Sequence, residues 1–481
     1  MVSTKIQNFI KDNWLITLII IAATLLRTWD IGTRGILFSD AGRDLRVAQA
    51  SVETQQLPLV GIPSSIPRFH QGPVTIWIEM LIYLAFGHQT IAFSVIFAFF
   101  GVLAVIAVYE YCVVYINKKT ALIAATILSF SPLAIAHSRV PYHTNPIPLA
   151  IMIYLFTLQY LWQNKKLGLF WAGLGWILVM QFELNLFSLG LIIPYILWRK
   201  KIKLKLNSIS QLSAAMLIGL LPQIAYDLSH SFGESQLGGF MLWISYRLAS
   251  FAGAVGNNRP SFSSILETLS LFKHYWGRIF STQSDLILYI FLGIFIFTII
   301  KIIKNQRKIN IGLIIPSLAL VLLTSSYFVH GSPSEAYFPP YFPLLSIFIG
   351  WGISEVFNKQ KIIVVIGLVI WSGINTLSII RHNFFVSNPQ SFNYGASILE
   401  QQQIMRQIYI LSDDNYRLAT THPAGRFESY FDNYFWLMNK SLTAEYQKSA
   451  PIFYIEPKDS ALSGYPDIIS LGFTTYDVYH R

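Results

Sequence analysis

The chain has 481 residues, of which 53% are hydrophobic, 15% are aromatic and only 12% are charged. A soluble domain carries about 25% charged residues, so this composition excludes an ordinary soluble protein and predicts a polytopic membrane protein. The formal net charge of +11 does not indicate a nucleic-acid partner, because the basic residues lie in short connections between apolar segments, where they mark orientation against a membrane.

Apolar segments recur along the chain, and most of them are long enough to cross a hydrocarbon core of about 30 Å, which takes roughly 17 to 25 helical residues. They cover residues 14–33, 90–116, 119–138, 145–163, 167–183, 184–198, 210–228, 284–303, 309–329, 337–357 and 362–380. No small-residue cleavage site follows the first segment, so we expect it to be retained as a span. The sequence therefore predicts an α-helical polytopic membrane protein with about eleven transmembrane helices.

Basic residues mark the orientation of these spans, because they cluster in every second connection. The clusters are Lys118 with Lys119, Lys165 with Lys166, residues 199–205, residues 301–308, and Lys359 with Lys361. The positive-inside rule assigns these connections, and the N-terminus with Lys5 and Lys11, to the cytoplasm. Counting the short apolar run at 73–87 as a span would turn every later cluster outward. We therefore predict that this run is a helix in the outer interface of the cell membrane.

Two long loops then face the outer side of the membrane, at residues 34–89 and 229–283. Long loops in compact folds are usually functional or disordered. The second loop contains amphipathic segments at 236–251 and 265–280, which predict further interfacial helices. Together with the spans, the loops make up a transmembrane module of residues 1–382.

The hydropathy falls after Arg381, and residues 383–481 are predicted to form a small α/β domain on the extracytoplasmic side. A helical pattern runs from 391 to 406, and an aromatic one from 427 to 438. Short strand-like runs lie at 408–411 and 416–419, between the two helical patterns, and at 452–455, after them.

The first polar segment after the first span, Phe38 to Arg46, is rich in charge. If it is helical, Asp40 and Asp44 lie one turn apart on one face, with Arg43 beside them. A carboxylate flanked by cations can take a proton from an attacking hydroxyl and stabilise a phosphate leaving group. An amphipathic interfacial helix with self-neutralising charges explains the same pattern, and the segment alone does not decide between the two.

Polar residues gather at the outer ends of several other spans. They are His137, Arg139, His143, Asn145, Glu183, Asn185, Asp227, His230, His330 and Glu335. Any outer loop carries polar residues, but these lie on the same side as Arg68 and His70 of the first outer loop, so together they predict a cavity that opens outward. Arg27 lies inside the first span, where a charge is costly. We expect it either to reach outward to water or to pair with an acid such as Asp40.

Three motifs in the first outer loop resemble those of the C-type membrane glycosyltransferases, a superfamily that includes protein O-mannosyltransferases and lipid A aminoarabinose transferases. They are Asp40-Ala41-Gly42-Arg43 as a D-x-x-R pattern, Leu57-Pro58-Leu59-Val60-Gly61, and Phe69-His70-Gln71-Gly72-Pro73. Ser131-Pro132, Arg139 and Asn145-Pro146 also resemble the family's connection between its third and fourth spans. The resemblance covers residues 10–380. The chain departs from the family pattern where Ala41, and not Glu, follows Asp40, and where Gly72 replaces the first proline of a His-Pro-Pro motif.

The resemblance implies transfer of a sugar from a polyprenyl-phosphate donor to an acceptor hydroxyl of a protein, lipid or glycan, with inversion at the anomeric centre. Asp40 would be the general base and point into the cavity, while Asp44, the other candidate for this role, would pair with a neighbouring arginine. The donor phosphate would be bound by Arg43, Arg68, His70 and Arg139. The cavity would be completed by His137, His143, Asn145, Glu183, Asn185, His330 and Glu335.

Other functions and cofactors remain open at this point. The resemblance assigns no cofactor, although Asp40, Asp44 and Glu183 could supply hard oxygen ligands to a divalent metal. A membrane transporter or lipid flippase is the main alternative function. Transporters carry ionisable residues near the bilayer midplane and often have inverted repeats, whereas the acids here lie at one face. A third alternative is a non-catalytic membrane protein whose function lies in its C-terminal domain.

Overall fold

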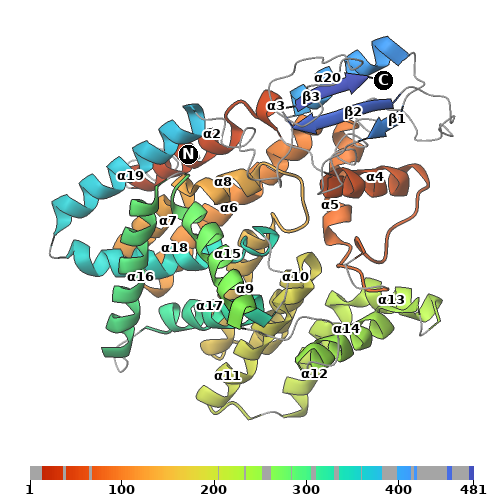
Figure 1. The fold of residues 1–481 in the computed structure, drawn as a ribbon. Helices are drawn as coiled ribbons and strands as arrows, with labels where there is room; N and C mark the ends of the chain where they lie inside the picture. The colour runs from red at the N-terminus through yellow and green to blue at the C-terminus, as the bar shows by residue number, and fades with distance from the viewer. Residues whose placement is uncertain are drawn as a thin grey trace, which may run out of the picture.

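The computed structural model describes residues 13–35, 39–63, 68–203, 205–231, 234–251, 262–282, 284–304, 310–329, 335–358, 360–381, 398–412, 417–419, 452–457 and 476–480. Most of these residues are helical, and a small sheet lies at one side of the helical body (Figure 1). The fold class predicted for the body of the chain is therefore confirmed.

The helices follow the predicted segments closely. In the first half of the chain they are α2 (Trp14–Thr28), α3 (Ile31–Arg34), α4 (Ser39–Glu53), α5 (Val74–Phe86), α6 (Thr90–Tyr115), α7 (Lys118–Phe130), α8 (Pro132–Ser138), α9 (Ile147–Trp162), α10 (Gly168–Phe182), the 3-10 helix η1 (Leu184–Leu191), α11 (Ile192–Arg199), α12 (Leu206–Gly219) and α13 (Leu221–Ser229). In the second half they are α14 (Gln236–Phe251), α15 (Phe262–Phe280), α16 (Asp285–Lys304), α17 (Ile311–Val329), the 3-10 helix η3 (Glu335–Tyr337), α18 (Tyr341–Phe357), α19 (Lys361–Arg381) and α20 (Ile398–Ser412).

Several helices have the length and composition of membrane spans. Within the described residues, four of them, α6, α16, α17 and α19, are long and apolar enough to cross a membrane, and the number rises to six if the bent pairs α7 with α8 and α12 with α13 are single spans. The two pairs are bent by 64° and 66°. Shorter apolar helices, among them α2, α9, α10 and α18, coincide with other predicted spans. The predicted membrane character is therefore confirmed, while the count of about eleven spans stays a prediction.

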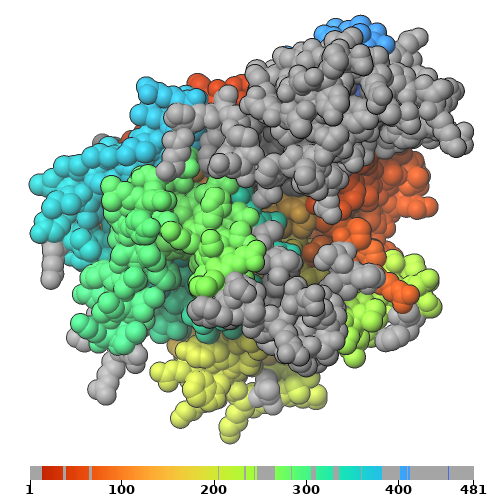
Figure 2. Space-filling model, viewed as in Figure 1, coloured from red at the N-terminus to blue at the C-terminus, as the bar shows by residue number. Residues whose placement is uncertain are grey.

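The helical body is built around α18, whose residues are almost all buried. It packs against α7 and α16, and α7 packs in turn against α6. The helices at the periphery expose large apolar side chains, such as Leu286 of α16 and Ile362 of α19. In the space-filling view these two helices, coloured green and cyan, form one side of the molecule (Figure 2). We expect these exposed faces to contact lipid, because contiguous apolar surface of this kind marks a membrane contact.

Both outer loops contain the helices predicted for them. In the first loop, α4 and α5 pack against each other, and α5 has 13 residues, which is too short to cross a bilayer unaided. In the second loop, α14 and α15 coincide with the predicted amphipathic segments. Their position in the membrane interface stays a prediction.

Arg27 takes neither of the two positions expected for it. Its buried guanidinium donates hydrogen bonds to the carbonyls of Leu128 at 3.0 Å and of Ser129 at 3.3 Å, both at the end of α7. Pro132 has no backbone N–H and begins α8 in a new direction, so the last carbonyls of α7 lack partners within a continuous helix. Arg27 supplies those missing donors, which is why a cation is tolerated in this apolar span.

One prediction in the C-terminal region was wrong. Residues 408–411 belong to α20 and not to a strand, because Ile404, Met405 and Ile408 form a buried helical stripe that continues through this segment. The strands β1 (Arg417–Ala419) and β2 (Ile452–Pro457) match predicted runs, and β3 (Tyr476–His480) was not predicted. The sheet order is β1-β2-β3, with β1 parallel and β3 antiparallel to β2. The predicted helix at 427–438 lies outside the described residues, so a separate α/β domain stays a prediction.

Replacement of Arg27 tests its part in joining α2 to α7. Arg27→Met leaves the carbonyls of Leu128 and Ser129 buried without these donors, which is expected to reduce stability by on the order of 2 to 3 kcal/mol. Thermal unfolding of the purified protein in detergent measures the change. Lys301→Met is the control, because Lys301 makes a partly exposed contact of 3.8 Å with Glu355 and lies 5.9 Å from the ring centre of Phe297, and exposed ion pairs contribute about 0 to 1 kcal/mol. Equal unfolding midpoints for the two variants would show that the hydrogen bonds of Arg27 do not stabilise the contact between α2 and α7.

Candidate active site

Helix α4 carries two acids in different environments. Ala41, Asp44, Leu45 and Ala48 are all buried and lie on one face, at the spacing of successive helical turns. The apolar members of this face pack against the neighbouring helices. Asp44 is therefore a fully buried carboxylate, with a side chain that is 0% exposed, whereas the side chain of Asp40 is 49% exposed.

Arg43 is held between these two acids, as the helical spacing predicted. Its Nη1 lies 3.2 Å from Oδ1 of Asp40, and its Nη2 and Nε donate to Oδ1 of Asp44 at 3.0 and 3.1 Å. Burial alone would lower the pKa of Arg43, but the carboxylates of Asp44 and Asp40 outweigh burial and raise it above the ordinary value. The side chain of Arg43 is still 35% exposed. The acid-arginine cluster of Asp40, Arg43 and Asp44 thus presents a fixed cation with one accessible side.

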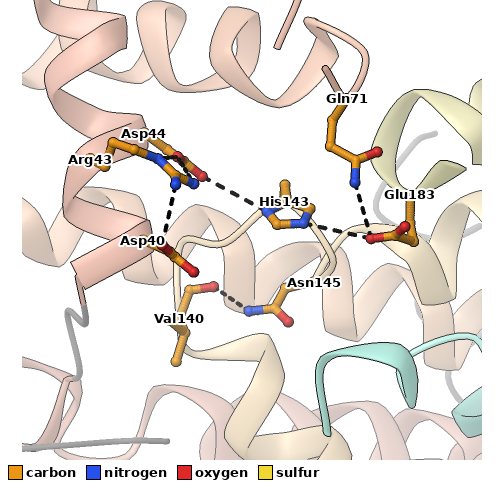
Figure 3. A network of polar contacts seen from close by, with 8 residues as sticks. All are labelled: Asp40, Arg43, Asp44, Gln71, Val140, His143, Asn145 and Glu183. Atoms are coloured by element: carbon orange, nitrogen blue, oxygen red, sulfur yellow. Dashed lines mark hydrogen bonds and ion pairs between the residues drawn. The ribbon is translucent and has the colours of Figure 1, made fainter. Parts of the chain in front are cut away.

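His143 connects the buried acid of α4 to a second acid. It lies in the loop between α8 and α9, with Nδ1 3.8 Å from Oδ2 of Asp44 and Nε2 3.8 Å from Oε2 of Glu183 (Figure 3). Burial alone would lower the pKa of His143, but the two carboxylates raise it above the ordinary value. A protonated His143 is therefore stabilised between Asp44 and Glu183.

Gln71 and the start of η1 complete this arrangement. The amide of Gln71 donates to Oε2 of Glu183 at 3.3 Å and accepts from the backbone N–H of Leu184 at 3.1 Å. A Cβ atom at Gly72 would lie 2.7 Å from Cα of Gln181, so only glycine allows this loop to approach α10 so closely. Asp40, Arg43, Asp44, His143, Glu183 and Gln71 form one continuous polar chain (Figure 3).

A second buried network lies at the other end of the same loop. His137 contacts Oδ1 of Asn145 through Nδ1 and Oε1 of Glu335 through Nε2, both at 3.1 Å. Arg278 of α15 pairs with the other oxygen of Glu335 at 3.2 Å. This network ties the loop to α15 and η3, so three of the predicted cavity residues, His137, Asn145 and Glu335, meet in one cluster separate from Arg43.

The other predicted cations lie in different surroundings. Arg139 is buried and donates through Nη1 to the carbonyls of Trp29 and Leu26 at 2.7 and 3.4 Å, so it fixes the end of α2; burial lowers its pKa to about 10. Arg68 is exposed and His70 is half-buried, in the loop before α5. The backbone N–H of His70 donates to Gln236 at 3.0 Å, which docks this loop on α14.

A cavity opens beside Glu183. The space in it that a water-sized group can occupy is about 30 Å³, and the cavity is partly open to solvent. Its lining includes Glu183, Asn185, Ser326, Tyr327, Tyr337 and Tyr341. Asn185, a predicted cavity residue, therefore faces open space, whereas the predicted residue His330 lies outside the described residues. Aromatic walls with a few polar groups are typical of small-molecule sites.

Two buried polar residues of the first outer loop, Gln71 and Glu79, were not predicted from the sequence to belong to the site. Gln71 lay within a quoted motif but was given no role, and Glu79 of α5 was not considered. Glu79 is fully buried on the same face as Thr75, Ile76 and Ile82. An acid among apolar residues at helical spacing indicates a buried acid, so the burial of Glu79 could have been predicted from the sequence.

The structure brings no set of metal ligands together within the residues that it describes. No three His, Cys, Asp or Glu side chains there lie close enough to hold one metal ion. Asp40 and Glu183, two of the oxygen donors considered from the sequence, lie at opposite ends of the polar chain, with His143 between them (Figure 3).

Comparison with protein families gives one match. Residues 70–226, about a third of the chain, match the family model described as dolichyl-phosphate-mannose-protein mannosyltransferase. No curated protein matches the chain significantly. The matched region begins at His70 and includes Gln71, Glu79, His143 and Glu183, so much of the polar chain lies within it.

The fold is shared with known structures. ArnT from Cupriavidus metallidurans in the apo state matches with a TM-score of 0.60 and 11% identity over 98% of both chains. ArnT bound to undecaprenyl phosphate matches with a TM-score of 0.58 and 11% identity, over 97% of this chain and 98% of that chain. The apo oligosaccharyltransferase of Archaeoglobus fulgidus gives a TM-score of 0.48 and 12% identity over 84% of this chain and 59% of that chain. The two ArnT matches show an ArnT-like fold along nearly the whole chain, and together with the family-model match they confirm the resemblance to C-type membrane glycosyltransferases.

The position of His143 between two acids makes the stability of the protein depend on pH. Its pKa is raised in the folded state, so its contribution is fully present below the unfolded value of about 6.5 and is lost as the pH rises through the folded value. We expect the unfolding temperature of the wild type to fall as the pH rises from about 6.5 through the pKa that His143 has in the folded protein. His143→Gln should flatten the fall, whereas His230→Gln, which changes an exposed histidine, should leave it unchanged. Identical pH profiles for wild type and His143→Gln would exclude a protonated bridge.

Proposed function

We propose that the chain is a membrane glycosyltransferase that moves a sugar from a polyprenyl-phosphate donor to an acceptor hydroxyl. The acid-arginine cluster of α4 is the observation that carries this proposal, because it offers a fixed cation beside an accessible carboxylate. Two findings support the class of reaction and donor. The chain matches a mannosyltransferase family model over residues 70–226, and a protein of the same fold, ArnT, has been observed with undecaprenyl phosphate.

Arg43 is the proposed binding group for the donor phosphate. Asp44 occupies its Nη2 and Nε from the buried side, while Nη1, among the residues that the structure describes, pairs with the half-exposed Asp40. A phosphate can therefore approach Nη1 and share the guanidinium with Asp44. Charge that develops on the leaving phosphate is best stabilised by a cation that is already fixed in a site of low dielectric. Burial of the Asp44 carboxylate against the arginine provides that fixation.

Asp40 is the proposed general base, because it is the accessible acid of the pair. Its carboxylate would take the proton of the acceptor hydroxyl as the hydroxyl oxygen attacks the anomeric carbon. The bond from that carbon to the phosphate oxygen breaks, and its electron pair leaves with the polyprenyl phosphate. Attack opposite the leaving group inverts the anomeric centre. Asp44 is fully buried, so its proposed role is to position Arg43 and not to contact the acceptor.

The mouth of the cavity beside Glu183 is the proposed site of the sugar ring, one edge of which would enter the narrow space inside. Tyr327 and Tyr341 would pack against its apolar face, and Glu183 and Asn185 would accept or donate hydrogen bonds to its hydroxyl groups. His143 connects this cavity to Asp44. Arg68 and His70, on the same loop as Gln71, remain proposed secondary contacts of the donor, whereas the contacts of Arg139 with α2 favour a structural role.

The proposed orientation follows the positive-inside rule. The N-terminus would be cytoplasmic, and both outer loops, with the acid-arginine cluster, would lie on the extracytoplasmic side. Residues 383–481 would follow on that side, beyond a transmembrane module of residues 1–382. The acceptor would then be a hydroxyl group outside the cytoplasm.

A transfer assay tests the proposed function against its alternatives. Purified protein in proteoliposomes is incubated with a polyprenyl-phosphate sugar labelled in the sugar, together with extracted membrane lipids, glycans or proteins as acceptors. The enzyme is expected to release free polyprenyl phosphate and to move the label to an acceptor. A transporter or flippase would move the donor across the bilayer intact. Translocation without release of polyprenyl phosphate would overturn the proposal.

The two acids of α4 should respond differently to replacement by asparagine, which keeps their shape and removes their charge. Asp40→Asn should reduce turnover by about a hundredfold to ten-thousandfold, the usual contribution of a general base. Asp44→Asn should raise the donor KM more than it lowers kcat, because it loosens Arg43 and leaves the base in place. Asp30→Asn, which removes a charge from an exposed pair with Arg34, should change neither. An active Asp40→Asn beside an inactive Asp44→Asn would show that the base is assigned to the wrong acid.

A further inference from the structure

Glu79 is a buried acid without an assigned role. It lies on α5, its side chain is 0% exposed, and its neighbours on the same face are Ile76 and Ile82. Both of these isoleucines pack with apolar residues of α4, the helix that carries the acid-arginine cluster. Glu79 therefore lies in the interface between α4 and α5, near enough to Asp44 and Arg43 for their charges to act on it.

The hydrogen bonding of this interface is incomplete if both of its acids are ionised. Within the described residues, neither carboxyl oxygen of Glu79 has a hydrogen-bond partner, and Oδ2 of Asp44 has none either. Buried carboxylates without donors are strongly disfavoured. Burial raises the pKa of Glu79 well above its ordinary value, and the charge of Asp44 raises it further, while Arg43 lowers it. One additional proton on the two acids would remove the repulsion between their negative charges. It would also supply one of the hydrogen-bond donors that these oxygens lack.

The charges around Glu79 come from one helix. Asp44 and Arg43, both of α4, are the charged groups that act on it in the part of the chain that the structure describes. Helices α6 and α10 also contact α5, and neither contributes a charge to Glu79. His143 acts on Asp44, because its Nδ1 faces Oδ2 of Asp44 at 3.8 Å.

We propose that Glu79 is a positioning residue that works as a neutral acid, sharing its proton with Asp44 so that the buried pair carries a single negative charge. That charge is balanced by Arg43, whose accessible Nη1 then remains free to exchange Asp40 for a phosphate. Ionisation of Glu79 would place a second anion behind the arginine, and the site would repel the phosphate. The consequence for phosphate binding rests on the proposed function, whereas the neutral state of Glu79 does not.

Infrared spectroscopy of the full-length protein in detergent tests the neutral state directly. A protonated carboxyl group gives a C=O stretching band that is distinct from the bands of a carboxylate. We expect such a band at neutral pH, expect it to shift when glutamate is labelled with ¹³C at its side-chain carboxyl, and expect it to be absent from Glu79→Gln. Glu53→Gln is the matched control, because Glu53 is an exposed acid at the end of α4, and it should keep the band. Absence of a glutamate-derived band in the wild type would overturn the proposal, and this test does not depend on a variant that folds.

Binding of polyprenyl phosphate tests the functional consequence. At neutral pH, Glu79→Gln should bind it within about threefold of the wild type, because the amide is neutral and still donates a hydrogen bond. As the pH rises past the point at which the infrared band disappears, wild-type affinity should fall by up to about tenfold per pH unit, the slope of one linked proton. The affinity of Glu79→Gln should not follow this fall.

The outcomes separate the two proposals. A fall shared equally by wild type and Glu79→Gln, or a Glu79→Gln variant that is folded but cannot bind phosphate at neutral pH, would overturn the role of Glu79. If no form of the protein bound polyprenyl phosphate while the infrared band was present, Glu79 would be a neutral acid as proposed, and the donor assignment would be the part that failed.

Discussion

The ion pair between Arg43 and the buried Asp44 is the interaction on which the rest of the site depends. The buried carboxylate is stabilised because a cation contacts it through two nitrogens, and the cation is itself fixed by that contact. The apolar residues around Asp44 on α4 pack against α5, so the loop must fold to bury the pair. The result is a fixed positive charge with one accessible side, which suits an anionic leaving group.

The loop between α8 and α9 joins this cluster to the core of the protein. His143 reaches Asp44 and Glu183 from this loop, and Asn145 of the same loop joins the second network with His137 and Glu335. Arg27 holds the sharp turn from α7 into α8 by donating to the last carbonyls of α7. Buried polar groups with partners on several helices specify one arrangement of those helices, so the position of the proposed base follows from contacts made throughout the helical body.

The local part of this arrangement could be predicted from the sequence. Helical spacing was enough to bring Asp40, Arg43 and Asp44 together, because residues three and four apart share a face. The sequence also placed Asp40 in a cavity and Asp44 beside an arginine, but it was not used to predict that Asp44 and Glu79 are buried, although each is an acid on an apolar helical stripe. Long-range partners could not be predicted: the acceptors of Arg27 lie about a hundred residues away, and nothing near Glu183 indicates Gln71. The strand predicted at 408–411 was wrong because Ile408 continues a buried helical stripe that outweighs its β propensity.

The central claim is that a phosphate group binds to the accessible side of Arg43, and a structure of the protein with polyprenyl phosphate bound would test it most directly. The account predicts that a phosphate oxygen occupies the position that Asp40 holds beside Nη1, that Asp44 keeps its contacts with Nη2 and Nε, and that the Asp40 carboxylate turns toward open space. A phosphate bound at Arg68, or at the network of Arg278 and Glu335, with the pair of Asp40 and Arg43 intact, would contradict it.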